Sequence, residues 1–249
     1  QIGDRELIEK FKYGRQTPVR ITWNNFVRTR EELAGKVTTH LLMDSVTLLQ
    51  YLEDEEFLAP YGFNKETSRC LFIPNTYEVY WNISPRKLLK KMQENHKVFW
   101  NDERKAKAKA LGLTPIEVQT LASIVDEETN YLPEKPTVAG MYYNRLKTDM
   151  PLQADPTVKF AMQNFALKRI YNNMLLYPSP YNTYYTTGLP PGPIRIASVA
   201  GIDAVLNMHH HDFFYMCAKD DLSGSHVFAL TYPEHLQNAA KYTAALNAR

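Results

Sequence analysis

The sequence lacks long apolar runs, and no stretch of about 18 apolar residues, the length of a membrane-crossing helix, occurs in it. A signal peptide is lacking too, and the first residue is Gln1 instead of methionine. We therefore expect a fragment or processed form. Any membrane anchor is expected to lie upstream of Gln1 and outside this chain.

Cysteine is scarce, because only Cys70 and Cys217 occur and they lie far apart. Two such cysteines make neither a disulfide framework nor a cysteine metal site, and they leave the cellular compartment open. Gly-rich phosphate loops, a Ser-His-Asp order and metal-ligand spacings are also missing. The sequence therefore implies no metal and no organic cofactor.

The sequence also lacks a marked excess of positive or negative charge. Lys and Arg total 29 and Asp and Glu total 27, which gives a formal net charge of +2. This balance gives no reason to expect nucleic acid as a partner. Hydrophobic residues make up 44% and charged residues 22%, as is ordinary for folded proteins. The 249 residues allow either one large domain or two modest ones.

Hydrophobic periodicity predicts short, mixed elements in the first part of the chain. TPVRITWNNF alternates as a strand does, with Val19, Ile21 and Trp23 on one face. The lysine-rich segment after Pro85 is predicted to be one long helix with a solvated basic face. In this part we expect helices over residues 4–13, 28–44, 46–58 and 85–111, and extended segments over 17–26 and 69–82.

Helix-capping signals become sharper in the second part. Thr114-Pro115-Ile116-Glu117 is a capping box with proline at the first helical position, and it predicts a helix that runs to about Thr129. Asp155 before Pro156 predicts another helix, with Asp155 as its cap. Residues 177–195 hold five prolines and two glycines, so they cannot be a regular helix or a central strand. Further helices are expected over 134–147, 198–208 and from Thr231 onward, and a hairpin over 213–218 and 226–230.

Three consecutive acids, Asp126, Glu127 and Glu128, end the helix predicted from Thr114. At about 100° per residue, Glu128 lies within about 20° of Leu121 and so continues a buried stripe. Asp126 points nearly the opposite way and Glu127 to the side, so we expect substitutions of these two to spare activity. Burial and the helix C-terminus should both raise the pKa of Glu128, which suits a general acid. Structural carboxylates show such shifts as well.

Specific motifs follow in a fixed order between residues 121 and 228. They are Leu121–Thr129 (LASIVDEET), Asn144-Arg145-Leu146, Leu152–Val158 (LQADPTV), Tyr181-Asn182-Thr183-Tyr184, Gly188–Ile194 (GLPPGPI) and Gly224–Phe228 (GSHVF). Each is weak alone, but together and in this order they are specific. They resemble the motifs of the YceG-like (MltG) family of endolytic murein transglycosylases, whose catalytic glutamate, followed by threonine, falls on Glu128. The family usually has glutamate where this chain has Asp126.

The resemblance implies an α+β fold, in which a helix-borne catalytic Glu128 lies beside a small antiparallel sheet. It also implies that residues 1–68 form part of a LysM-like α/β module and a connector, although this region matches the family only loosely. Residues 69–249 would be the catalytic domain. The motifs point to Asn144, Arg145, Gln153, Asp155, Tyr181, Asn182, Thr183, Tyr184 and His226 as substrate-binding residues.

The implied reaction is cleavage between N-acetylmuramic acid and N-acetylglucosamine within nascent peptidoglycan strands, which ends their elongation. Glu128 would protonate the leaving oxygen and then accept the proton of the muramoyl C6 hydroxyl, which closes a 1,6-anhydro ring. A tethered nucleophile explains how one carboxylate suffices. The resemblance implies glycan strands as the partner, with cell-wall synthases as a possible second partner. The implied location is the bacterial inner membrane, with the catalytic domain outside the cytoplasmic membrane or in the periplasm.

Three other readings stay open. An inverting peptidoglycan hydrolase would need a second carboxylate with a bound water. A non-catalytic glycan-binding module is disfavoured by the intact Glu128. A pyridoxal-phosphate lyase would need a Schiff-base lysine with a phosphate cradle, and neither can be identified in the sequence.

Overall fold

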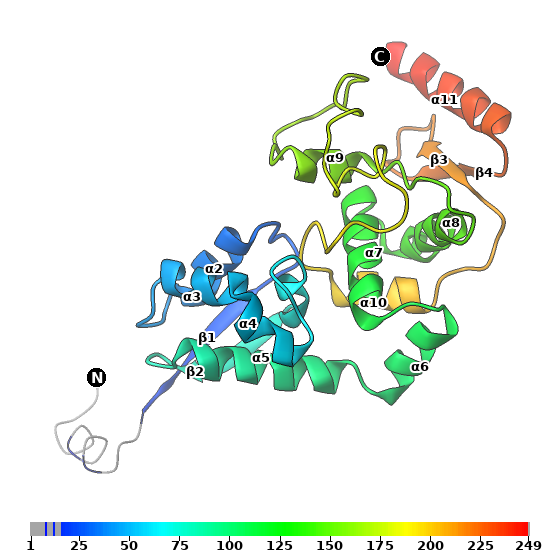
Figure 1. The fold of residues 1–249 in the computed structure, drawn as a ribbon. Coiled ribbons are helices and arrows are strands. Elements are labelled where there is room, and N and C mark those ends of the chain that lie inside the picture. Colours follow the sequence, from blue (N-terminus) through cyan, green and yellow to red (C-terminus); the bar gives the residue numbers. More distant parts are fainter. Residues whose placement is uncertain (1–7, 9–11, 13–15, 249) are drawn as a thin grey trace.

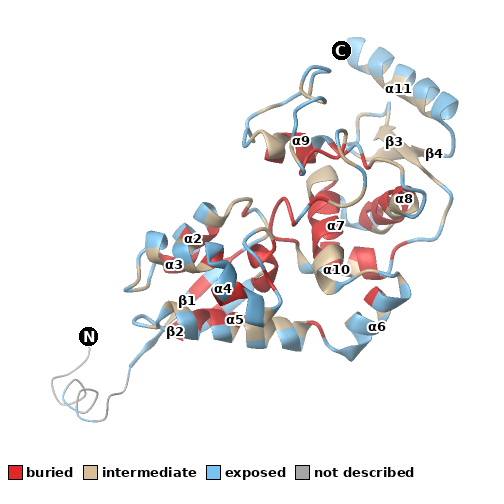
Figure 2. Ribbon diagram, in the orientation of Figure 1, coloured by how far each residue is buried: buried red, intermediate tan, exposed pale blue. Residues whose placement is uncertain are grey.

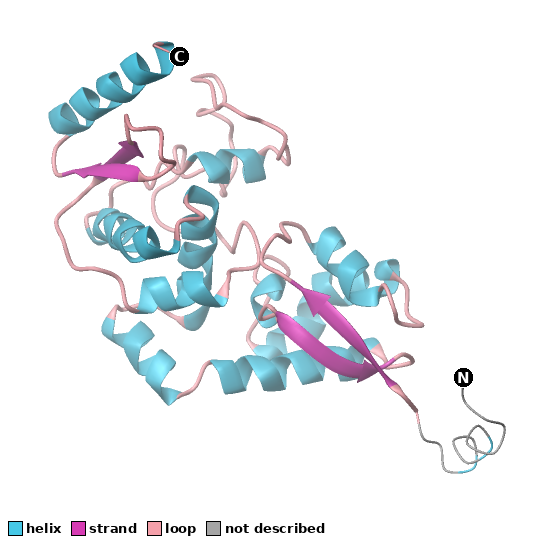
Figure 3. Cartoon of the chain, turned by 180° about the vertical axis from the view of Figure 1, so that it is seen from behind, coloured by secondary structure: helices cyan, strands magenta, loops and turns pink. Residues whose placement is uncertain are grey.

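The computed structural model describes residues 8, 12 and 16–248, so the helix expected over residues 4–13 lies almost entirely outside the described residues. Within the described residues the chain forms two lobes, drawn from blue to cyan and from green to red in Figure 1. Each lobe holds one two-stranded antiparallel sheet among helices (Figure 3). The predicted α+β class is confirmed. No helix in the described part of the chain has the length and apolar character that crossing a membrane requires.

The N-terminal lobe is a two-stranded sheet covered by short helices. Strands β1 and β2 pair antiparallel from Pro18 with Tyr80 to Trp23 with Asn75. The alternation of β1 buries Ile21 and Trp23, and the Trp23 ring stacks on Tyr77 of β2 at 4.7 Å. The elements are β1 (Pro18–Trp23), α2 (Arg30–Thr38), α3 (Ser45–Glu53), α4 (Glu55–Leu58), η1 (Ala59–Tyr61), η2 (Ser68–Leu71), β2 (Asn75–Tyr80) and α5 (Pro85–Phe99).

Polar caps divide two of the predicted helices. The segment 85–111 forms two helices, because the Asn101 side chain accepts a hydrogen bond from the Arg104 N–H and starts α6 (Asp102–Ala110). In the same way Asp54 caps α4 and separates it from α3 within the helix expected over 46–58. A long helix over 85–111 was therefore a wrong prediction, since an asparagine cap outweighs the helical propensity of the lysines around it.

The structure has two hydrophobic cores, and the chain passes from the first to the second between Met92 and Trp100. Buried residues from Ile21 to Met92 form one cluster, together with Ile196, and those from Trp100 to Met208 form the other. The sequence placed a domain boundary at residues 68 and 69. In the structure β2, which follows that point, completes the sheet of the N-terminal lobe.

The C-terminal lobe is built around α7, with α8 and α10 packed on it and the β3–β4 hairpin beside α11. Thr114 makes the predicted capping box with Glu117 at the start of α7. The expected proline-rich stretch over 177–195 contains no regular element. The elements are α7 (Pro115–Glu128), η3 (Leu132–Glu134), α8 (Lys135–Lys147), α9 (Asp155–Ala161), α10 (Val199–Leu206), β3 (Tyr215–Ala218), β4 (His226–Ala229) and α11 (Tyr232–Asn247).

Candidate active site

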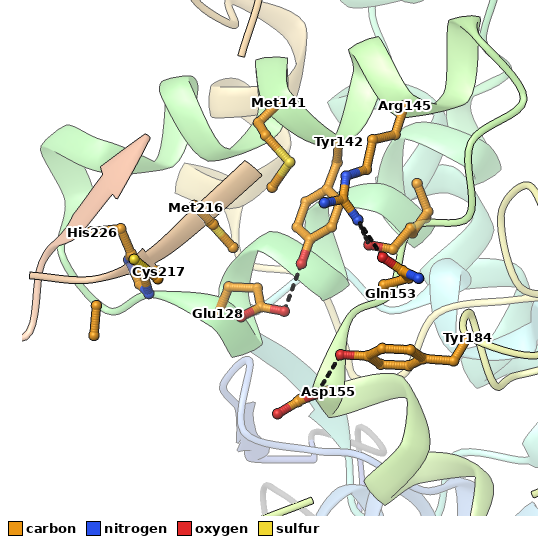
Figure 4. A pocket seen from close by; sticks show the side chains of 12 residues that line it. Glu128, Met141, Tyr142, Arg145, Gln153, Asp155, Tyr184, Met216, Cys217 and His226 are labelled. Carbon is orange, nitrogen blue, oxygen red and sulfur yellow. Dashed lines mark hydrogen bonds between the residues drawn. The ribbon is translucent and has the colours of Figure 1, made fainter. Parts of the chain in front are cut away.

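A cavity of about 250 Å³ opens at the C-terminal end of α7 (Figure 4). Its walls come from α7, α8, α9, the hairpin and the loop that contains Tyr184. The lining residues are Glu128, Met141, Tyr142, Arg145, Leu152, Gln153, Asp155, Tyr184, Met216, Cys217, Ala218 and His226. Six of the predicted site residues therefore share one cavity.

Glu128 is the last residue of α7, where Thr129 turns to an extended conformation and ends the helix. The hydroxyl of Tyr142 donates a hydrogen bond of 2.7 Å to Oε1 of Glu128. The pKa of Glu128 is raised to about 7, first because burial desolvates its charged form, and also because Asp155 and Glu127 carry like charge. The hydrogen bond from Tyr142 and the nearby His226 act in the opposite direction. The predicted rise in pKa is confirmed, and Glu128 can hold or release a proton near neutral pH.

The other two acids of the triplet are paired, which corrects the interpretation from helical phase. Asp126 is buried, forms an ion pair with Lys135 and accepts hydrogen bonds from N and Oγ of Ser198. Glu127 pairs with Arg28 and Arg195. Helix α7 is buried on every side from Val118 to Asp126 (Figure 2), so no single apolar stripe sets Glu128 apart. Its distinction is that it alone of the three lines the cavity.

Asp155 brings a second carboxylate into the cavity. It was expected to cap α9, but Ala154 occupies the cap position and makes no side-chain cap. Asp155 lies in the first turn and accepts a hydrogen bond of 2.7 Å from the Tyr184 hydroxyl. Burial, and then this bond, raise the pKa of Tyr184, so the phenol stays protonated as the donor.

Arg145 and Gln153 also line the cavity. The Arg145 guanidinium donates to the carbonyl oxygens of Phe214 at 2.6 Å and Leu152 at 2.8 Å, and it lies 5.3 Å from the centre of the Tyr215 ring. Burial lowers its pKa from the usual arginine value. Gln153 has a φ of 52°, a left-handed conformation, and its backbone N–H donates to the Thr183 carbonyl at 3.0 Å.

His226 enters the cavity from β4, and a buried glutamate holds it. Nδ1 of His226 lies 2.9 Å from Oε2 of Glu134, and the His226 amide donates to Oε1 of Glu134 at 2.7 Å. The hydroxyl of Thr129, next to Glu128, also donates to Glu134 at 3.2 Å. This network fixes the orientation of the imidazole and connects it to the end of α7.

Four predicted binding residues do not line the cavity. Asn144 donates to the His211 and Phe213 carbonyls, and Tyr181 donates to Glu66 of the N-terminal lobe. Asn182 and Thr183 are fully buried. Asn182 bonds the backbone of residues 175, 177 and 184, and Thr183 bonds residues 154 and 157. In this structure these side chains hold the surrounding loops in place.

The sequence interpretation missed Tyr142, the direct partner of Glu128. One signal was present, because Tyr142 lies three residues before Arg145 and so shares its helix face. Met141, Leu152 and the hairpin residues Met216, Cys217 and Ala218 were missed as well. They carry no chemical signal in the sequence, since only tertiary packing brings them to the cavity.

Comparison with known proteins agrees with the motif order. The model of the YceG-like family matches residues 1–241. The endolytic murein transglycosylase of Bacillus subtilis is 39% identical over 128 residues, which is 51% of this chain and 35% of that protein. The enzyme of the same name from Streptococcus pneumoniae serotype 2 is 33% identical over 138 residues, or 54% of this chain and 25% of that protein. The chain thus matches only about a quarter to a third of these relatives' lengths.

The fold has a counterpart among solved structures. A crystal structure of a YceG-like protein of Listeria monocytogenes superposes with a TM-score of 0.73 and 23% sequence identity. The match covers 95% of this chain and 81% of that one.

Proposed function

This chain belongs to the YceG-like family, and from that premise we propose that it cleaves peptidoglycan strands internally as a lytic transglycosylase. The observation that carries the proposal is Glu128, a carboxyl with a pKa of about 7 in a cavity that holds further polar side chains. A carboxyl whose pKa lies near neutral pH can serve first as an acid and then as a base.

In the proposed reaction, Glu128 gives its proton to the glycosidic oxygen between N-acetylmuramic acid and N-acetylglucosamine. The bond from the muramoyl C1 to that oxygen breaks, and the C6 oxygen of the same sugar bonds to C1. The C6 hydroxyl proton goes to Glu128, which restores the acid. The products are a 1,6-anhydromuramoyl end and a new N-acetylglucosamine end, and no water is consumed. Such a cut would end the elongation of a nascent strand.

Asp155 favours a second candidate, the inverting hydrolase. Inverting glycosidases use one carboxylic acid and one carboxylate that activates water, and Asp155 lies in the same cavity as Glu128. The Tyr184 hydroxyl donates to Oδ1 of Asp155. No other described residue bonds its Oδ2, which could accept a proton from water. In this scheme Asp155 would be the base and the new muramoyl ends would be ordinary reducing ends.

The roles proposed for the other predicted site residues depend on whether they line the cavity. Arg145, Gln153, Asp155, Tyr184 and His226 would bind sugar hydroxyls and amides, because their polar groups line the cavity. Asn144, Tyr181, Asn182 and Thr183, which were predicted to bind substrate directly, are proposed instead to support the loops around it.

The N-terminal lobe is proposed to be a LysM-like glycan-binding module, and its core supports a module that ends between Met92 and Trp100. A membrane anchor outside this chain, action on the outer side of the cytoplasmic membrane and contact with cell-wall synthases complete the proposal. Of these, only action on the outer side of the cytoplasmic membrane draws support from the relatives, whose names refer to murein.

Digestion of peptidoglycan strands in water enriched in heavy oxygen, followed by mass analysis, tests the chemistry. Lytic cleavage gives anhydro ends that are lighter by one water and carry no label. Labelled reducing ends would identify the hydrolase. Asp155→Asn should retain product formation in the first case and lose it in the second. Intact strands after incubation with the folded protein would refute both.

A further inference from the structure

The two lobes meet behind Glu128, at the last turn of α7. Arg28, in the segment between β1 and α2, donates from Nε and Nη2 to the two carboxylate oxygens of Glu127 at 2.9 and 3.0 Å. The exposed fractions of these side chains are 31% and 15%, so water screens the pair only partly. The N-terminal lobe therefore contacts the helix one residue away from Glu128.

Arg195, in the loop before α10, makes a second ion pair with Glu127. Its Nη1 lies 3.2 Å from Oε1 of Glu127, and its Nε donates to the carbonyl of Asn25 in the N-terminal lobe. The amide of Ile196 donates to the Val27 carbonyl at 2.8 Å. Figure 1 shows the blue segment after β1 running beside the yellow segment before α10.

We propose that Arg28 is a positioning residue, which fixes the last turn of α7 from the N-terminal lobe and so sets the orientation and charge environment of Glu128. The inference rests on the proposed role of Glu128 as the reacting acid. Through the segment between β1 and α2, the N-terminal lobe would then help to orient the reacting acid and would not serve only to attach the protein to glycan.

Geometry explains why an arginine is suited to this task. A helix end has few intrahelical hydrogen bonds to hold it. A two-pronged arginine–carboxylate contact fixes direction as well as distance, which a lysine cannot do. A displacement of about 1 Å at a reacting group can lower the rate on the order of 100-fold. A contact that holds the residue next to Glu128 can therefore affect the rate of catalysis.

Charge adds a second effect. The carboxylate of Glu127 raises the pKa of Glu128, and Arg28 partly neutralises that carboxylate. Loss of Arg28 should raise the pKa of Glu128 further, whereas loss of Glu127 should lower it. Among the described residues, the other titratable or charged groups that line the cavity with Glu128 are Tyr142 and Arg145 from α8, Asp155 from α9, Tyr184 from the loop, Cys217 from β3 and His226 from β4.

The test is steady-state cleavage of peptidoglycan strands by the full chain over a range of pH. Arg28→Gln should lower kcat about 10-fold with KM changed by less than about twofold. The pH at which kcat/KM falls should move upward. Glu127→Gln should also lower kcat but move that pH downward, and Arg28→Lys should give an intermediate kcat.

Arg20→Gln is the matched control, because Arg20 also pairs with a glutamate, Glu78 at 3.1 Å, but the side chains are 76% and 57% exposed on the outer sheet. It should leave kcat and the pH profile unchanged. Wild-type kcat and pH profile in Arg28→Gln would overturn the proposal, as would pH shifts in the same direction for Arg28→Gln and Glu127→Gln. If Arg28→Gln does not fold, a wild-type kcat in Arg28→Lys would overturn it. Absence of cleavage by the unaltered chain would instead refute the proposed function.

Discussion

Replacing Tyr142 with phenylalanine would remove one hydroxyl and leave the ring in place. That hydroxyl donates to Glu128 at 2.7 Å and favours the carboxylate over the protonated acid. A hydrogen bond to a charged group contributes about 1.5–3 kcal/mol, and one pKa unit corresponds to about 1.4 kcal/mol. The pKa of Glu128, which is about 7 in the intact cavity, should therefore rise by about one to two units in Tyr142→Phe.

The assay is kcat/KM for strand cleavage as a function of pH. A general acid must carry its proton, so kcat/KM falls as pH rises through the pKa of Glu128. In Tyr142→Phe this fall should occur about one to two pH units higher than in the unaltered protein. Tyr143→Phe is the matched control, because the Tyr143 hydroxyl donates at 2.8 Å to the Leu111 carbonyl, outside the cavity. A fall that stays in place or moves to lower pH would refute this account of Glu128.

Three other substitutions test the site and its support. Glu128→Gln should reduce cleavage at least about 100-fold. Folding raises the pKa of Glu128 from 4.5 to about 7, so the unfolding free energy of the unaltered protein should fall by up to about 3 kcal/mol as pH rises through that window. The unfolding free energy of the variant should not show this fall. Asp126→Asn leaves the buried Lys135 cation without its carboxylate and should cost about 3–5 kcal/mol in denaturant unfolding. Gly192→Ala would place a Cβ 2.3 Å from the Glu66 carbonyl of the other lobe and should cost about 1–3 kcal/mol in the same assay.

Controls for the stability predictions come from the same protein. Asp102→Asn alters a fully exposed aspartate in the first turn of α6 that pairs with the exposed Lys105, so its unfolding free energy should stay within about 1 kcal/mol of that of the unaltered chain. Gly35→Ala adds a Cβ that meets nothing within 4 Å and should not destabilise α2. An Asp126→Asn or Gly192→Ala protein as stable as these controls would contradict the packing described above. A pH dependence of stability unchanged in Glu128→Gln would contradict the raised pKa.

Local signals in the sequence predicted the elements whose ends depend on their own residues. Thr114 caps α7 as expected, because the bonds of a capping box join residues only three apart. The failures arose where a competing local bond was overlooked or where the partner is distant. Asn101 interrupts the predicted long helix by capping α6, and Asp155 bonds Tyr184 in place of the α9 backbone.

The candidate site shows the same division. Glu128 could be predicted because its motif is specific and its burial was expected to raise its pKa, as the structure bears out. The ion pairs of Glu127 could not be predicted, because Arg28 is distant in the sequence and no periodicity of either segment indicates the contact. For the same reason helical phase alone could not show that α7 is enclosed on all sides.

The cavity also has a consequence for the order in which the protein becomes active during synthesis. Glu128 is made well before His226, and the hairpin that carries His226 forms one wall of the site. A nascent chain that has not yet reached β4 (His226–Ala229) can form α7 but cannot close the cavity. Strand-cutting ability should therefore arise only after β4 has been made, with α11 (Tyr232–Asn247) following directly behind it to pack on the hairpin.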